Sequence, residues 1–299
     1  MYKRLFSLLI LIAFAAAIQY FWGWGVLLQP WQSVPLTTGL LIVLLLLSSY
    51  AARALRLHDY YRQSHGGKFT VYLKIILYHN LLNNMLPMRS GELSFPFLMA
   101  RYCQVPPMHS VPTLIWFRFL DLHIVCTLAI VAASLSFGPG SLWLWLVLPW
   151  LPVPVIAYFA QYRLRNYLSA RDSGRWRDWL AKVLAALPAG QHTLWRSIGW
   201  SWLNWLVKIA VLAEVLRYFL PVAPSVAWLG AIGGDLTSVL PVHAPGGFGT
   251  YEAGVVAAMA PFEVDLAKAV PAAVNLHLFM LSGSILGAIA ALALPIRQR

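Results

Sequence analysis

The stretch Asn80-Leu-Leu-Asn-Asn-Met-Leu-Pro87-Met-Arg89-Ser-Gly91-Glu92 places amides, a cation and a carboxylate inside a chain that is otherwise apolar. A charged residue at the centre of a membrane-spanning helix costs about 2.5–3.5 kcal/mol on insertion scales. Such groups therefore need partners, water or a ligand. We interpret the stretch as the break of a helical hairpin, because irregular backbone at membrane depth is tolerated only where protein or a wet cavity encloses it.

A second stretch has the same pattern: Asp235-Leu-Thr-Ser-Val-Leu-Pro241-Val-His-Ala-Pro245-Gly246-Gly247-Phe-Gly249-Thr-Tyr-Glu252. It also interrupts an apolar run with proline and glycine, and it also ends on a glutamate. We predict that the two broken segments meet in the folded chain and together form its working site.

The overall composition is that of a membrane protein. Of the 299 residues 60% are hydrophobic and 11% are charged, and the mean hydropathy is +0.68. Soluble domains carry about a quarter charged residues. The net charge of +12 would suggest nucleic acid in a soluble protein, but here the basic residues lie between apolar runs. We therefore expect no nucleic-acid partner, and we interpret the basic segments as loops that face anionic lipid headgroups.

The apolar runs predict an all-α polytopic membrane protein with about six full spans, each of about 20 residues. A cleaved signal peptide over the first run is the less favoured alternative, because the run continues past its alanines. The expected spans cover about 5–28, 36–54, 112–137, 142–160, 198–220 and 268–294.

Two further segments each hold a pair of apolar pieces that are too short to cross comfortably. We predict that 70–103 is a re-entrant hairpin open to the cytoplasm and that 225–259 is one open to the outside. The chain would then be a single membrane domain, 1–299, with inverted pseudo-repeat units at about 36–137 and 198–294, as in transporters with a midplane site. A basic cytoplasmic loop at about 161–197 would join them.

The positive-inside rule sets the expected orientation. A cluster of basic residues follows the second span and is assigned to the cytoplasm, and both termini, which are basic, are expected there too. We expect a plasma membrane or bacterial inner membrane location. The cluster consists of Arg53, Arg56, Arg62, Lys68 and Lys74. Trp200, Trp202 and Trp205 are expected in an interfacial aromatic belt.

The glycine-rich turn is the first candidate for ligand binding. Gly246, Gly247 and Gly249 allow unusual backbone turns and leave amide groups free to approach a ligand. If a half-helix starts at about Thr250, its positive end and those amides form an anion site. The turn is not the phosphate loop of nucleotide hydrolases, because no Gly-Lys-Ser/Thr follows.

Charged side chains complete the candidate site. Arg89 and Arg118 are expected to hold a phosphate, since a guanidinium is always charged and binds two oxygens at once. Carboxylates are expected to balance these arginines or to take up and release protons: Glu92, Asp121, Asp235 and Glu252. Asn83 and Asn84 add amides.

Two structural alternatives stay open. Arg118 and Asp121, at i and i+3, can form an ion pair within one helix that only neutralises itself. More widely, the buried charges can form a salt-bridge network that stabilises the fold and binds nothing.

No metal or cofactor is expected. Cys103 and Cys126 have no metal-ligand spacing, and the sequence shows neither an Asp-rich metal motif nor a His cluster. We interpret four histidines as ordinary interfacial or packed residues: His79, His123, His243 and His277.

The motifs carry a resemblance to a known family. Asn83 to Glu92, then Arg118-Phe-Leu-Asp121, then Leu240-Pro241 with Pro245 to Glu252, resemble the three signatures of the flippase-like family named after the transmembrane region of lysylphosphatidylglycerol synthase. The resemblance covers nearly the whole chain. It implies an integral membrane unit that moves lipids between leaflets, such as aminoacylated phosphatidylglycerol, hopanoids or polyprenyl-phosphate lipids.

The chain ends at Arg299, a few residues past its last expected span, whereas the synthase has a catalytic domain there. We therefore expect a stand-alone member without aminoacyl-transfer activity. The function expected is translocation of an anionic lipid, in which membrane lipids are the partners. A membrane-embedded lipid-phosphate transferase or hydrolase, with Glu92 or Asp235 as general base, is the alternative. A non-transporting partner of a separate lipid-modifying enzyme is another.

Overall fold

The structure is a computed structural model, and it describes residues 2–138, 143–169, 174–185, 187–188, 190–237 and 245–294. For some residues within these ranges, including 2–11 and 87–89, it describes the backbone and not the side chain. The described residues form helices and contain no strand, so the predicted all-α membrane fold is confirmed.

The helices follow one another with short connections. In chain order they are α1 (Tyr2–Phe21), α2 (Trp24–Leu28), η1 (Gln29–Ser33), α3 (Leu36–His65), α4 (Phe69–Met85), η2 (Pro87–Leu93), α5 (Ser94–Cys103), α6 (Pro107–Phe137), α7 (Trp143–Trp150), α8 (Val153–Ser169), α9 (Arg175–Ala185), α10 (Gln191–Phe219), α11 (Pro224–Thr237), η3 (Pro245–Gly247), α12 (Thr250–Met259), η4 (Ala260–Phe262) and α13 (Leu266–Ala293).

Five helical segments within the described ranges are long and apolar enough to cross a membrane. They correspond to the second through sixth expected spans: Leu36–Arg62, Pro107–Phe137, Leu144–Gln161, Gln191–Phe219 and Leu266–Ala293.

The first expected span, 5–28, differs from the structure. Helix α1 ends at Phe21, and the chain bends by 85° between Ile12–Phe21 and Trp24–Ser33. Gly23 lies at this bend with a φ of 77°, a conformation that glycine adopts without steric cost. The apolar run therefore continues through a sharp turn, because hydrophobicity alone does not keep a helix straight.

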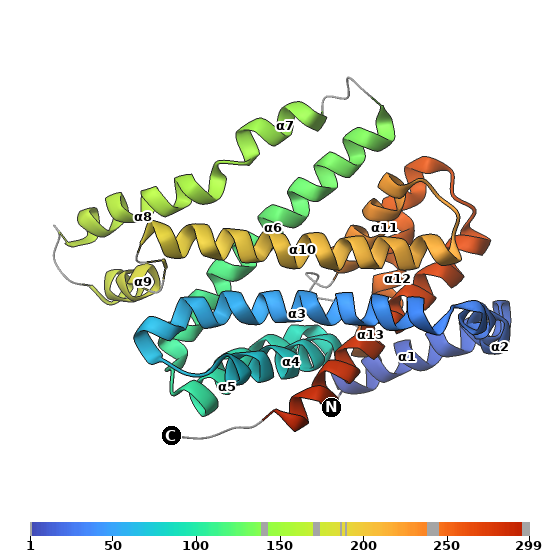
Figure 1. The fold of residues 1–299 in the computed structure, drawn as a ribbon, viewed down its shortest axis with the longest axis horizontal. Helices are drawn as coiled ribbons and strands as arrows, with labels where there is room; N and C mark the ends of the chain where they lie inside the picture. The colour runs from blue at the N-terminus through green and yellow to red at the C-terminus, as the bar shows by residue number, and fades with distance from the viewer. Residues whose placement is uncertain are drawn as a thin grey trace.

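The long helices α3 and α10 lie side by side across the middle of the molecule (Figure 1). Helix α4 packs against α3 and α13, and its partner α5 packs against α6. In the second pair, α11 and α12 pack against each other. Helix α11 also packs against α10, and α12 packs against α13. Both predicted pairs of short helices around a break are thus present. Their entry into the membrane from opposite sides stays a prediction.

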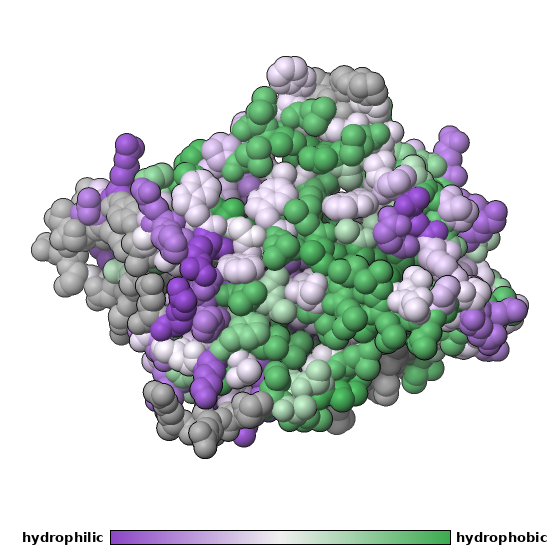
Figure 2. All heavy atoms as spheres, in the orientation of Figure 1, coloured by the Kyte–Doolittle hydropathy of each residue, from purple (hydrophilic) through white to green (hydrophobic). Residues whose placement is uncertain are grey.

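The surface hydropathy agrees with a membrane setting. Figure 2 shows hydrophobic residues across the middle of the visible face and hydrophilic residues gathered toward its two ends. The long helices run from one of these ends to the other (Figure 1). A belt of apolar surface perpendicular to the helices is the pattern expected of a multi-pass protein.

The basic cluster assigned to a cytoplasmic loop is partly inside the bundle. Helix α3 continues to His65 instead of ending near Ala54, and it carries Arg56 into the core with 3% of its surface exposed. Lys74 of α4 is also buried, and its Nζ donates to the Leu294 carbonyl oxygen at 3.1 Å. The assignment of these residues to a loop was wrong, because each has a partner within the fold that offsets its desolvation.

Candidate functional site

The two broken segments meet inside the bundle. The turn η2, which follows α4, contacts η3, and α4 itself also contacts η3. Gly246 of η3 lines the same cavity as Asn83 and Asn84 of α4. The predicted meeting of the two breaks is therefore confirmed, and one cavity receives groups from both.

This central cavity is polar and small. Its volume is about 60 Å³, and because one water needs at least about 10–15 Å³, it has room for a few waters or one small anionic group. A whole lipid does not fit. Three cations line it, Arg53, Arg118 and Lys208, together with one carboxylate, Asp235.

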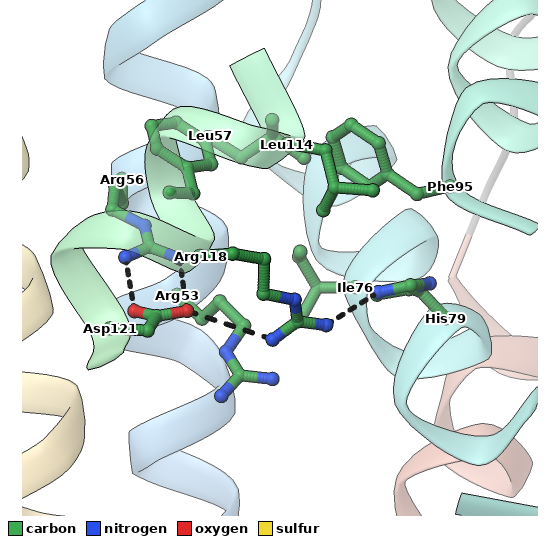
Figure 3. A pocket seen from close by; sticks show the side chains of 10 residues that line it. Arg53, Arg56, Leu57, Ile76, His79, Phe95, Leu114, Arg118 and Asp121 are labelled. Atoms are coloured by element: carbon green, nitrogen blue, oxygen red, sulfur yellow. Dashed lines mark hydrogen bonds and ion pairs between the residues drawn. The ribbon is translucent and has the colours of Figure 1, made fainter. Parts of the chain in front are cut away.

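A second, smaller cavity adjoins it. Figure 3 shows its lining, which includes Arg56, His79 and Asp121. Arg53 and Arg118 line both cavities. These two arginines therefore place the two cavities next to each other in the bundle.

A deeply buried ion pair joins α3 to α6. Arg56 Nη1 lies 2.6 Å from Asp121 Oδ1, and Arg56 Nη2 lies 3.3 Å from Oδ2 (Figure 3). The indole of Trp205, on α10, donates to Asp121 Oδ1 at 3.0 Å. Trp205 is buried, so its expected place in an interfacial belt was wrong. Asp121 thus ties three long helices together.

Arg118 links α6 to the first hairpin. Its Nη2 lies 2.7 Å from Glu92 Oε1 and 3.3 Å from His79 Nε2. Its Nη1 lies 3.7 Å from Asp121 Oδ2, so the predicted pair within α6 exists but is the longer contact (Figure 3). The alternative of a self-contained pair in one helix is wrong, since Arg118 and Asp121 both have closer partners on other elements.

Lys208 and Asp235 connect α10 to the second hairpin. Lys208 Nζ lies 2.6 Å from Asp235 Oδ2, with both side chains largely buried. The same ammonium lies 5.0 Å from the centre of the Trp205 ring, within the range of a cation–π contact. Asp235 thus balances a lysine, whereas the sequence analysis paired it with arginines.

Glu252 and His277 form a pair at the other wall of the cavity. His277 Nδ1 lies 2.7 Å from Glu252 Oε1. The other oxygen, Oε2, accepts from the Gly249 N–H at 2.7 Å. Helix α12 does begin at Thr250 as predicted, but the carboxylate of its own first turn occupies the Gly249 amide. That amide is therefore not available to a ligand in this state.

Arg53 differs from the other cations of the site. Its Nη1 donates to Asn80 Oδ1 at 2.8 Å, and its buried Nε has no hydrogen-bond partner in the described part of the chain. Arg56, Arg118 and Lys208 each have a carboxylate partner, and no described carboxylate pairs with Arg53. Figure 3 shows Arg53 beside the Arg118–Asp121 contact without joining it.

Other buried polar atoms around the central cavity also lack partners among the described residues. They include Asn80 Nδ2, Asn83 Oδ1, Arg118 Nε, Tyr251 Oη and His277 Nε2. Buried polar atoms are nearly always hydrogen-bonded in folded proteins, either to protein or to water. Donors and acceptors left open around one cavity indicate a place for water or a polar ligand.

The predicted site residues fall into three groups. Asn83, Asn84, Arg118, Asp235 and Gly246 line the central cavity. Glu92, Asp121 and Glu252 lie behind it in the ion pairs, and Gly247 and Gly249 belong to the turn that precedes α12. The side chain of Arg89 lies outside what the structure describes, so its role stays a prediction.

The sequence analysis missed Arg53, Arg56 and Tyr251. Arg53 and Arg56 are three positions apart in the sequence. Residues at this spacing lie on the same face of a helix, which is the signal that could have grouped them. His79 and His277 are packed as expected, with 2% and 0% of their surface exposed, and each also lies beside a glutamate of the network. His243 lies in a segment that the structure does not describe.

No metal centre is visible in the described ranges, where no group of three or more His, Cys, Asp or Glu side chains has the geometry to hold an ion. The site is therefore a set of ion pairs around a small cavity with a cationic lining.

Comparison with known proteins agrees with the motifs. A comparison with curated proteins found no match. The family model described as the lysylphosphatidylglycerol synthase transmembrane region matches residues 4–287. That range includes both hairpins and every residue of the network described above. The chain therefore belongs to the family of the lysylphosphatidylglycerol synthase transmembrane region.

Proposed function

We propose that this protein moves an anionic lipid between the two leaflets of its membrane. The observation that carries the proposal is Arg53, a cation that faces a cavity inside the bundle and has no carboxylate partner among the described residues. A buried cation with no direct carboxylate contact is costly within a membrane protein unless nearby charge, a ligand or water compensates it. A phosphate or carboxylate headgroup supplies that charge.

The size of the central cavity defines which part of the lipid enters. A volume of about 60 Å³ admits the charged group of a lipid and excludes its chains. The chains then stay in the bilayer while the headgroup passes between the hairpins. Arg118 and Lys208 contribute further positive charge, and Asn83 and Asn84 contribute amides to neutral parts of the headgroup.

The proposed setting is the plasma membrane or bacterial inner membrane, with both termini in the cytoplasm. The partners are membrane lipids with anionic headgroups. A separate lipid-modifying enzyme would supply or consume the lipid, in line with the family to which the chain belongs.

The proposal is tested in vesicles of phosphatidylcholine that contain the purified protein and a fluorescent phosphatidylglycerol. Quenching of the outer leaflet at successive times measures movement. We expect faster movement than in protein-free vesicles, and slower movement of a fluorescent lipid with no net charge. Equal rates with and without protein, for several anionic headgroups, would contradict the proposal.

Arg53→Gln is the informative variant. A hydrogen bond to a charged group contributes about 1.5–3 kcal/mol, so loss of Arg53 should weaken headgroup binding roughly 10- to 100-fold. The matched control is Arg217→Gln, because Arg217 lies on the same bundle but pairs with Glu214 on the surface of α10. We expect the control to move lipid at the rate of the unmodified protein.

A lipid-phosphate transferase or hydrolase is the second candidate function. The observation in its favour is the Glu252–His277 pair, in which a carboxylate orients an imidazole toward the cavity, as in general-base catalysis. Mass spectrometry of lipids incubated with the protein separates the two functions. A translocase returns its lipid chemically unchanged, whereas a transferase or hydrolase alters the mass of the headgroup.

The third candidate is a supporting role, in which the protein docks a separate lipid-modifying enzyme and moves nothing itself. Removal of the protein would then lower the activity of that enzyme and leave the distribution of lipid between leaflets unchanged. Translocation by the purified protein alone would exclude this role as its sole function.

A further inference from the structure

His277 is held in one orientation at the wall of the central cavity. It is fully buried, with 0% of its surface exposed. Its ring stacks on Tyr251 with a centroid distance of 4.4 Å and packs against Phe248 at 4.8 Å. Its Nδ1 is fixed by Glu252 at 2.7 Å. The imidazole therefore cannot turn its second nitrogen away from the cavity without breaking these contacts.

The hydrogen bonds assign the proton of the neutral ring. An ionised Glu252 only accepts, so Nδ1 carries the hydrogen and Nε2 is left as a bare acceptor. The other oxygen of Glu252 also accepts, from the Gly249 N–H. Nε2 is buried and has no hydrogen-bond partner in the described part of the chain. His277 lines the central cavity, so water or a ligand there can supply a partner.

From this geometry we infer that His277 and Glu252 form a proton-binding pair that couples proton uptake to the binding of the anionic headgroup. The inference rests on the proposed function, and it makes a proton gradient the energy source for lipid movement. In the step, a proton from water in the cavity bonds to Nε2, and the resulting imidazolium keeps its Nδ1–H on Glu252. No other bond forms or breaks, and the site gains one positive charge.

The charges around the cavity make protonation of His277 depend on whether the anionic headgroup is bound. Three cations of the cavity, Arg53, Arg118 and Lys208, oppose a further positive charge on His277. The carboxylates Glu252 and Asp235 favour it, and the phenols of Tyr50 and Tyr251 are neutral. Helix α4 presents only asparagine amides to this cavity. An anion that enters beside the cations removes part of the repulsion, so anion and proton bind together more readily than either alone.

This coupling is reciprocal, because an anion that favours the proton is itself favoured by the proton. One bound proton offsets the charge of one headgroup with a single negative charge. The pair then crosses with no net charge, and a pH difference across the membrane drives the lipid toward the alkaline side.

Proton uptake can be counted directly. The probe is a short-chain phosphatidylglycerol, titrated calorimetrically into the purified protein near neutral pH in two buffers with different heats of ionisation. We expect up to one proton taken up per lipid bound, so that affinity rises as pH falls by as much as about tenfold per pH unit. Binding without proton uptake, or no binding, would overturn the inference.

Two variants remove the proton site by different routes. His277→Asn keeps a donor to Glu252 but has no titrating nitrogen. Glu252→Gln turns an amide donor toward Nδ1, which moves the ring hydrogen to Nε2 and blocks it. Either variant that remains folded, judged by thermal unfolding, should take up no proton on binding. Undiminished uptake in a folded variant would overturn the inference. The control is His123→Asn, since His123 is buried but bonds to the Trp150 carbonyl away from this cavity.

A vesicle experiment separates this inference from the proposed function. Fluorescent phosphatidylglycerol is followed in vesicles with equal pH on both sides, then with an acidic or an alkaline exterior. We expect accumulation in the leaflet on the alkaline side and no such bias for His277→Asn. Movement that ignores the gradient would overturn the coupling and leave translocation intact. Absence of movement at every pH would overturn translocation itself, and the calorimetry then decides whether binding still takes up a proton.

Discussion

Arg118 lies 2.7 Å from Glu92 through its Nη2 and 3.7 Å from Asp121 through its Nη1, so one guanidinium bridges the first hairpin and the core of α6. The two carboxylates differ in burial: the side chain of Glu92 is 20% exposed and that of Asp121 is 5% exposed. This difference predicts how much each contributes to stability, because water competes with exposed ion pairs and not with buried ones.

Asp121→Asn should destabilise the protein far more than Glu92→Gln. Loss of Asp121 leaves Arg56 buried without its counter-charge, which costs about 3–5 kcal/mol. Loss of Glu92 is expected to cost less, because the Arg118 side chain is 30% exposed and keeps Asp121 as a second carboxylate at 3.7 Å. Thermal unfolding in detergent, followed by size-exclusion profiles, measures both. Equal losses would show that the burial difference does not control the energetics.

Because α11 and α12 pack closely at two glycines, replacing either glycine by alanine should lower the stability of the protein. A Cβ at Gly233 would overlap the Gly254 carbonyl oxygen, and a Cβ at Gly254 would overlap that of Gly233. Gly233→Ala or Gly254→Ala should therefore separate the two helices, which lowers thermal stability by several degrees and weakens lipid movement. The matched control is Gly199→Ala in α10, where nothing lies within 4 Å of the added carbon. That change should be neutral or stabilise by about 0.5–1 kcal/mol, because alanine favours helix.

The inverted arrangement predicts access from opposite sides of the membrane. In a protein in which Cys103 and Cys126 are replaced, single cysteines at Lys68 and Ala223 occupy exposed positions before α4 and before α11. We expect a membrane-impermeant thiol reagent to label Ala223→Cys in intact cells and Lys68→Cys in inverted vesicles. Labelling of both from one side would remove the inverted arrangement.

Replacement by lysine distinguishes two arginines as headgroup ligands. An ammonium keeps the charge but lacks the bidentate fork of a guanidinium. If Arg53 is the principal contact, Arg53→Lys should slow lipid movement several-fold and leave thermal stability nearly unchanged. Arg89→Lys should then have the smaller effect. The reverse order, measured in the same vesicles, would assign the headgroup to Arg89 as the motifs first suggested.

The sequence by itself determined the fold class and the place of the breaks. The hydrophobic runs predicted about six spans, of which five match helices long and apolar enough to cross in the described residues, and both pairs of short helices. A bilayer forces backbone groups into helices of a defined length. The polar stretch from Asn80 to Glu92 and the glycine turn before Thr250 also marked the site, because such residues are costly at membrane depth without a function.

Only the tertiary structure decided which charge pairs with which. Arg56 belongs to Asp121 and not to a cytoplasmic loop, Arg118 pairs more closely with Glu92 than with its helical neighbour, and Glu252 occupies the Gly249 amide expected to bind a ligand. The two arginine pairs join residues on different elements, so no local pattern encodes them, whereas the Glu252–Gly249 contact lies within the first turn of α12. Once each pair was assigned, Arg53 was the cation lining the central cavity without a carboxylate partner among the described residues. The physical reason is that ion pairs depend on three-dimensional proximity and burial, whereas spans and breaks depend on hydrophobicity and backbone geometry along the chain.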